Sequence, residues 1–136
     1  MEHFSNNIKS LSLEICEHQI RLNKVRRTRM NNRVQRYFNS SMQRNVFARL
    51  MCKGLYLDEW YSVNEIAEEL FLTRQTAHRV VSDCLAEGWV TKKENLRPGV
   101  YRASPILIEH MEKYVEAYRE ELVRLEKELS NLRKLK

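Results

Sequence analysis

The chain has 136 residues, of which 31% are charged, and a formal net charge of +6. This length suits one domain with a modest core, and the positive charge favours acidic partners. No apolar run approaches the roughly 20 residues that span a bilayer, and the polar amino terminus shows no signal peptide. With only three Gly and two Pro, we expect a mainly helical protein of the cytoplasm.

The first helix is expected at about residues 5–28. Its apolar residues recur at spacings of three and four, which places them on one helix face. These residues are Ile8, Leu11, Ile15, Leu22 and Val25. His18 interrupts the stripe, and we interpret it as a residue at the edge of the apolar face rather than as a ligand or a pH switch.

Shorter helical segments follow. The residues that continue an apolar face around a break at Asn31-Asn32 are Met30, Val34, Tyr37 and Phe38. A further helix is expected at residues 43–53, and its buried residues are Val46, Phe47, Leu50 and Met51. We expect Gly54 to end this helix, because glycine readily takes the left-handed conformation of a helix terminus.

Charge is unevenly distributed along this part of the chain. From His18 to Leu57 there is no acidic residue, and the basic residues there are Arg21, Lys24, Arg26, Arg27, Arg29, Arg33, Arg36, Arg44, Arg49 and Lys53. Such a one-sided tract repels itself unless a polyanion or an acidic surface neutralises it. One reading is neutralisation by the seven acidic residues between Asp58 and Gly88. The other is contact with nucleic-acid phosphates, for which the candidates are Arg26, Arg27, Arg29, Arg33 and Arg36.

The stretch from Ser62 to Arg102 has the pattern of a helix-turn-helix followed by a β-hairpin. Ser62 and Glu65 have the spacing of a capping box, which begins a short helix. Thr73 is a good N-cap for a second helix, Arg74 to about Glu87. Gly88 suits the end of that helix.

Residues 89–93 and 100–103 are expected to form two short strands, and Trp60-Tyr61 could add a third. The turn Arg97-Pro98-Gly99 fits between the two strands, because proline presets φ and glycine allows a positive φ. A helix, a turn, a helix and a hairpin in this order are the layout of a winged helix-turn-helix. The sequence therefore predicts a mainly α fold with a two- or three-stranded antiparallel wing.

The second helix of this motif has two chemically different faces. At about 100° per residue, its inner residues are Ala77, Val80, Val81 and Cys84, and its outer, acid-free residues are Arg74, Gln75, His78, Arg79 and Ser82. Arg can bridge O6 and N7 of guanine, and Gln can bridge N6 and N7 of adenine. The outer face is thus typical of a DNA-reading helix, although a merely solvated face would also be polar.

The segment Leu72 to Val90, LTRQTAHRVVSDCLAEGWV, resembles the recognition helix of the MarR-type winged-helix regulators. Ser62 to Leu70 resembles the helix that precedes it. The resemblance implies a winged helix-turn-helix that binds double-stranded DNA, with flanking helices that hold a homodimer together.

Two positions depart from the family pattern. Phe71 stands where the inter-helix turn often has glycine, and because a left-handed Phe would be strained, we expect another turn geometry. The wing is short, and Asn95-Leu96-Arg97 stands nearest to the family's Asp-x-Arg pattern.

These features predict the DNA-binding residues. Arg74, Gln75, His78 and Arg79 are expected to face base edges or nearby phosphates, and Thr76 and Ser82 to bind phosphates. The wing residues expected against the backbone or the minor groove are Lys92, Lys93, Arg97 and Arg102.

Pro105 is expected to begin the last helix. From Ile108 the helix carries a heptad seam, and the expected dimerisation residues on it are Met111, Val115, Tyr118, Leu122, Leu125, Leu129 and Leu132. So long an apolar stripe must meet the amino-terminal helix, a second copy of itself, or both. We expect a homodimer, with the orientation of the paired helices left open.

No catalytic or metal-binding pattern is present. Cys16, Cys52 and Cys84 are widely separated without metal-ligand spacing, and we interpret them as small buried residues. Because some MarR-type proteins sense oxidants through a cysteine, a redox role stays open. We expect no enzyme activity, no cofactor and no bound metal.

The sequence thus predicts an amino-terminal helical segment at residues 1–42, a winged helix-turn-helix at 43–104 and a dimerisation helix at 105–136. The expected function is that of a dimeric, sequence-specific regulator of transcription, associated with the nucleoid if the source is bacterial. The alternatives are a non-specific architectural nucleic-acid protein and a winged-helix module that binds other proteins. The operator, the effector and the direction of regulation are not predicted.

Overall fold

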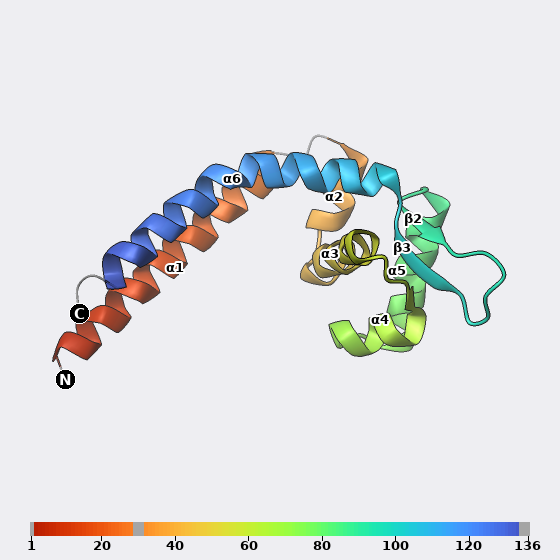
Figure 1. Cartoon of the computed structure of the whole chain (residues 1–136), viewed down its shortest axis with the longest axis horizontal. Helices are drawn as coiled ribbons and strands as arrows, with labels where there is room; N and C mark the ends of the chain where they lie inside the picture. The colour runs from red at the N-terminus through yellow and green to blue at the C-terminus, as the bar shows by residue number, and fades with distance from the viewer. Residues whose placement is uncertain (1, 29–31, 134–136) are drawn as a thin grey trace. The chain divides into compact units, whose positions relative to one another are not determined.

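A computed structural model describes residues 2–28 and 32–133, and these form two compact units. One unit consists of helix α1 (Glu2–Thr28) and the part of helix α6 (Pro105–Arg133) that follows Glu112. The other contains every described element between these helices, together with the first residues of α6 (Figure 1). Helix α6 is therefore one continuous helix that contributes to both units.

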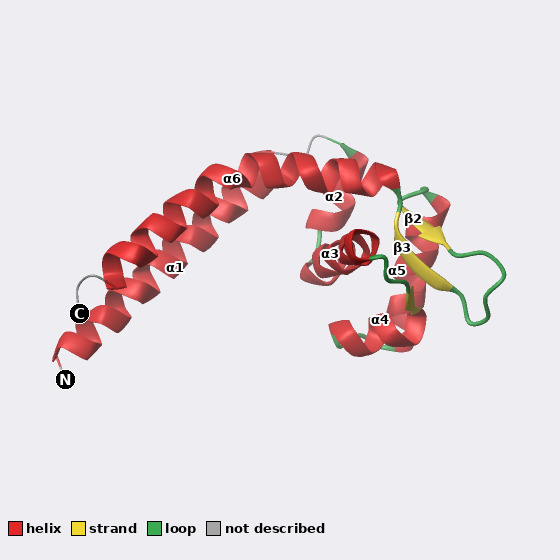
Figure 2. Ribbon diagram, in the orientation of Figure 1, coloured by secondary structure: helices red, strands yellow, loops and turns green. Residues whose placement is uncertain are grey.

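The second unit is a winged helix-turn-helix. Its elements are α2 (Arg33–Asn39), α3 (Met42–Leu57), β1 (Tyr61–Ser62), α4 (Val63–Leu70), α5 (Arg74–Ala86), β2 (Val90–Lys92) and β3 (Val100–Ala103). The strands form an antiparallel sheet in the order β1-β3-β2, in which Tyr61 lies opposite Tyr101 and Thr91 opposite Arg102. The predicted fold class is confirmed, including the third strand (Figure 2).

The predicted helix caps of the motif are present. The hydroxyl of Ser62 accepts a hydrogen bond from the backbone N–H of Glu65, while the Glu65 carboxylate accepts one from the N–H of Ser62. Thr73 caps α5 through the N–H of Thr76, at 3.1 Å. After α5, Gly88 takes a φ of +75°, the left-handed conformation that favours glycine.

The predicted end of α3 is wrong. Gly54 lies inside the helix, which continues to Leu57, and the left-handed residue at its end is Asp58, with φ 55°. Gly54 is needed there for space: a Cβ atom at this position would lie 2.8 Å from the carbonyl oxygen of Glu59. Asp takes the left-handed conformation more readily than most other residues that have a Cβ, so it can end the helix in place of glycine.

The predicted geometry of the turn between α4 and α5 is also wrong. Phe71 has φ 55° and ψ 43°, the left-handed conformation that its bulk disfavours. Its backbone N–H bonds the carbonyls of Ala67 and Glu68, which closes α4 as a glycine would. The side chain is 95% exposed, so burial of the ring does not offset the strain of the backbone.

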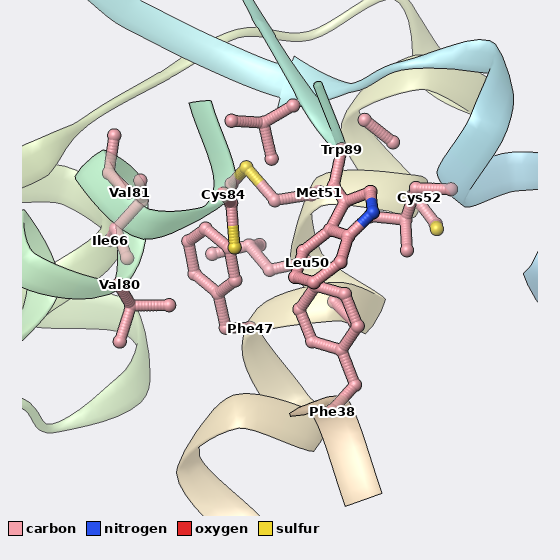
Figure 3. Packing of buried hydrophobic residues seen from close by; sticks show 14 of the residues in the cluster. Phe38, Phe47, Leu50, Met51, Cys52, Ile66, Val80, Val81, Cys84 and Trp89 are labelled. Carbon is pink, nitrogen blue, oxygen red and sulfur yellow. The ribbon is translucent and has the colours of Figure 1, made fainter. Parts of the chain in front are cut away.

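The core of the second unit lies between α3, α4, α5 and the base of the wing. Its fully buried side chains are Phe47, Met51, Ile66, Val81 and Cys84. The Trp89 indole lies against Phe38, with ring centroids 5.4 Å apart (Figure 3). It also lies against Tyr37, with ring centroids 5.2 Å apart. These contacts join α2 to the start of the wing, and each buried aromatic side chain contributes roughly 1.5–3 kcal/mol of hydrophobic stabilisation.

The first unit is a pair of helices that lie side by side and run in opposite directions (Figure 1). Its centre is polar. The Glu121 carboxylate lies 2.6 Å from Nε of Arg21 and 3.2 Å from Nδ1 of His18, and the Tyr118 hydroxyl lies 2.7 Å from Nε2 of His18. His18 is buried at 8% exposure, so it faces the second helix and does not lie at the edge of the apolar stripe as predicted.

Candidate nucleic-acid interface

The predicted reading helix presents its polar residues to solvent. Ala77, Val80, Val81 and Cys84 anchor α5 in the core. The residues on the outer side that are exposed are Arg74, Gln75, His78, Arg79 and Ser82. Thr76 is half-buried, and its hydroxyl oxygen accepts a hydrogen bond from the Thr73 hydroxyl at 2.9 Å. The structure therefore brings five of the six predicted residues onto one open surface and ties the sixth to the helix cap.

The two halves of α5 differ in charge. Its first turn contains no acidic residue, so no side-chain anion offsets the positive end of the helix dipole. The acids Asp83 and Glu87 lie at the other end of the helix. There the Tyr37 hydroxyl donates to Asp83 at 3.3 Å, and the Arg33 guanidinium lies 2.6 Å from Glu87. The amino-terminal half of α5 is consequently an anion-attracting surface, as nucleic-acid recognition requires.

The wing adds a second group of basic residues. Lys92, the last residue of β2, is exposed, as are Lys93 and Arg97 in the loop that joins β2 to β3. A backbone hydrogen bond from the N–H of Lys93 to the carbonyl of Val100, at 3.0 Å, closes the base of this loop. Leu96, near its tip, is 43% exposed. Lys92, Lys93 and Arg97 are therefore open to solvent.

Arg102 differs from the other predicted wing residues. Its Nη1 donates to Oδ1 of Asp58 at 2.6 Å, and its guanidinium lies over the Trp60 ring, 4.0 Å from the centroid. Only 20% of its side chain is exposed. The guanidinium that we expected to contact phosphate is therefore held by two groups of the protein itself, the Asp58 carboxylate and the Trp60 ring.

The basic tract is partly neutralised within the chain. Arg21 bonds Glu121 and lies 3.7 Å from Glu17, and Arg33 pairs with Glu87. Among the other phosphate candidates, Arg27 and Arg36 are exposed and Arg26 is half-buried, whereas Arg29 lies outside the described residues. Of these pairs, only that of Arg33 uses an acid from the stretch between Asp58 and Gly88, and the exposed Arg27 and Arg36 stay candidates for a phosphate contact.

The two buried cysteines have unreactive surroundings. Burial raises the pKa of the Cys52 thiol to about 12 and that of Cys84 to about 12, so neither is a thiolate at neutral pH. Cys16 is exposed on α1, which corrects the prediction that it is buried. Within residues 2–28 and 32–133 no group of His, Cys, Asp and Glu side chains could hold a metal ion, and no helix is long and apolar enough to cross a membrane.

The polar centre of the first unit and the anchoring of Arg102 were not predicted. The only sequence signals for the former are His18 in the apolar stripe of α1 and Glu121 beside the seam of α6. Nothing in the sequence links Asp58 with Arg102, because 44 positions separate them.

Comparison with known families gives a match over part of the chain. The model of the MarR family matches residues 58–99, which run from the end of α3 to the wing. The winged helix-turn-helix of this chain is similar to the MarR family over those residues. In this MarR-type segment, α5 stands where the sequence resemblance places the recognition helix.

The chain is also similar to a solved structure, the crystal structure of the transcriptional regulator BldR from Sulfolobus solfataricus. The two share 16% sequence identity with a TM-score of 0.48, over 99% of this chain and 97% of that one. None of the curated proteins matches the sequence. The MarR-type assignment therefore rests on the matched segment and on its fold.

Proposed function

We propose that this protein is a dimeric regulator of transcription that reads the sequence of double-stranded DNA with α5. One observation carries the proposal. The amino-terminal half of the MarR-type recognition helix presents exposed hydrogen-bond donors and no acidic residue. A face that served only for solvation would not need to exclude acids.

The side chains on this face have complementary roles. Arg74 and Gln75, in the first turn of α5, can make bidentate contacts to guanine and adenine in the major groove. His78 and Arg79 follow one turn later and reach bases or nearby phosphates. Thr76 and Ser82 have hydroxyls that suit phosphate oxygens, which fix position and carry no sequence information.

The wing would complete the contact. Lys92, Lys93 and Arg97 are exposed and have long, positively charged side chains, which suit the negative potential of the backbone or the minor groove. On this proposal the recognition helix supplies sequence preference and the wing supplies mainly affinity. Arg36 on α2 is a further candidate for a phosphate contact, because it is exposed.

Dimerisation is supported by the apolar surface of the first unit. The residues that stay 40–49% exposed there are Ile8, Leu11, Ile15, Val115 and Leu122. Leaving such a stripe in water is costly, at roughly 25 cal/mol for each Å² that could be buried. We propose that a second copy covers it, together with the half-buried Leu125, Leu129 and Leu132. Two recognition helices would then meet two half-sites related by two-fold symmetry.

The test is selection of bound sequences from a random duplex pool, followed by a salt series on selected and random duplex. The proposal expects selected duplex to bind 10³-fold or more tightly than random duplex, the order of specificity typical of such proteins. Equal affinities with a steep salt dependence would support the architectural alternative. No binding to either duplex at low salt would support the protein-interaction alternative.

A further inference from the structure

Arg102 occupies a junction in the winged helix-turn-helix unit. It lies on β3, the central strand of the sheet, directly opposite Thr91 of β2. Its guanidinium reaches Asp58, the residue that ends α3, and covers Trp60, which precedes β1. One side chain therefore links the end of a core helix to the base of the wing.

The surroundings of Arg102 are built for this close approach. A Cβ atom at Gly54 would lie 3.3 Å from Cβ of Arg102 and 2.8 Å from the carbonyl of Glu59, so glycine lets α3 come near the sheet. The N–H of Glu59 bonds the carbonyl of Gly54 at 2.7 Å, which fixes the chain that carries Asp58 and Trp60. The Nζ of Lys93, at the start of the wing loop, lies 5.8 Å from the centroid of the same Trp60 ring.

We propose that Arg102 positions the wing and does not itself bind phosphate. This inference rests on the proposed DNA-binding function and assigns a different role to one residue within it. Residues 93–98 of the wing loop are exposed, so we infer that the base of the loop sets its direction. By stacking on Trp60 and bonding Asp58, Arg102 holds that base and so sets where Lys92, Lys93 and Arg97 meet the duplex.

The geometry opposes a direct contact to DNA. A phosphate that approached Nη1 of Arg102 would compete with the Asp58 carboxylate, which would also repel it. Trp60 covers one face of the guanidinium, and only 20% of the side chain is open to solvent. Arg97, by contrast, is exposed in the loop itself.

The test compares variants of the full chain in a salt series on selected duplex. Each phosphate contact contributes roughly 0.9 to the slope of log affinity against log salt. Arg97→Gln, the control, should flatten the slope by about that amount. Arg102→Gln should weaken binding by roughly fivefold, as expected for loss of a stacked cation. It should also flatten the slope, because a misplaced wing loses the phosphate contacts of Lys92, Lys93 and Arg97. It should also erase minor-groove protection from hydroxyl radicals while the major-groove contacts remain.

Two further variants separate positioning from charge. Lys keeps the charge of Arg102 but loses its planar stacking and its fork of donors. Arg102→Lys should therefore weaken binding nearly as much as Arg102→Gln. Asp58→Asn should also weaken binding, and Asn keeps the left-handed backbone that this position requires. If Asp58 merely withheld Arg102 from DNA, the same change would tighten binding.

The outcomes are distinguishable, and thermal melts of each variant show whether it remains folded. A lower slope in Arg102→Gln that Arg102→Lys restores would overturn the inference, as would tighter binding by Asp58→Asn. A parent protein that binds selected duplex while Arg102→Gln keeps full affinity would overturn the inference alone. A parent protein that binds no duplex would overturn the proposed function, and the role of Arg102 with it.

Discussion

The Nε atom of Arg21 lies 2.6 Å from Oε1 of Glu121, and this bond joins α1 to α6 through a carboxylate that is only 8% exposed. Burial alone would raise the pKa of Glu121, but hydrogen bonds from Arg21 and His18, with the charge of Arg21, hold it below its ordinary value. Glu121 is therefore ionised at neutral pH. Because an ionised carboxylate can only accept, Nδ1 of His18 carries the proton that faces it.

This pairing makes the stability of the helix pair depend on pH. Since the pKa of Glu121 is lowered on folding, the stabilisation is present above the unfolded value of 4.5 and is lost as pH falls through the folded value. Glu121→Gln should lower the Tm by several degrees at pH 7, and the difference from the parent should shrink as pH falls below 4.5. Thermal melts between pH 3 and pH 7 measure this. Glu116→Gln, at an exposed i,i+3 pair with Arg119, is the control and should change little at any pH.

Phe71 gives a prediction about backbone strain. Replacing it with glycine relieves the left-handed conformation, and an exposed ring loses no packing. Phe71→Gly should therefore raise the free energy of unfolding by up to roughly 1 kcal/mol, the cost of the left-handed region less the added freedom of the unfolded chain. Phe71→Ala keeps the Cβ and should change little. Equal stability of the two variants in urea unfolding would show that the turn is not strained.

Local sequence patterns account for most of the fold. The caps at Ser62 and Thr73 bond residues only three positions away, and the left-handed conformation of Gly88 depends on that residue alone. The sequence therefore predicts all three directly. Phe71 and Asp58 could not be predicted in this way. The left-handed conformation is disfavoured for Phe71 and only tolerated by Asp58, so the surrounding fold decides both.

The candidate site shows the same division. The exposed face of α5 follows from helix periodicity, because an amphipathic helix buries one side and leaves the other in water. The tie between Arg102 and Asp58, and the cluster around Glu121, join residues more than 40 positions apart. Such contacts depend on how helices and strands pack against each other, and composition and residue spacing do not predict that packing.

The proposed dimer predicts different effects for two adjacent apolar residues. Leu122 and Val123 are 44% and 62% exposed and point about 100° apart around α6. Leu122→Asp would bury an unpaired carboxylate in the proposed interface, which costs several kcal/mol, so sedimentation should show monomer. Val123→Asp lies away from that face and should sediment as the parent does. A parent protein that is monomeric at micromolar concentration would contradict the dimer.

The basic tract predicts a contrast between two arginines of α2. Arg36 is exposed with no described ion pair, whereas Arg33 already pairs with Glu87 at 2.6 Å. If Arg36 contacts a phosphate, Arg36→Gln should flatten the salt dependence of duplex binding by roughly 0.9. Arg33→Gln should change the slope less and lower thermal stability instead. The same slope for Arg36→Gln as for the parent would remove Arg36 from the interface.

The central claim is that the outer face of α5 reads DNA sequence, and the affinity ratio between selected and random duplex measures it most directly. Gln75→Ala should weaken binding to selected duplex by roughly 1–3 kcal/mol and leave random duplex nearly unaffected. Ser82→Ala, on the same face but expected at a phosphate, should weaken both alike. If Gln75→Ala and Arg74→Ala both discriminate between the two duplexes as well as the parent does, α5 is not the reader.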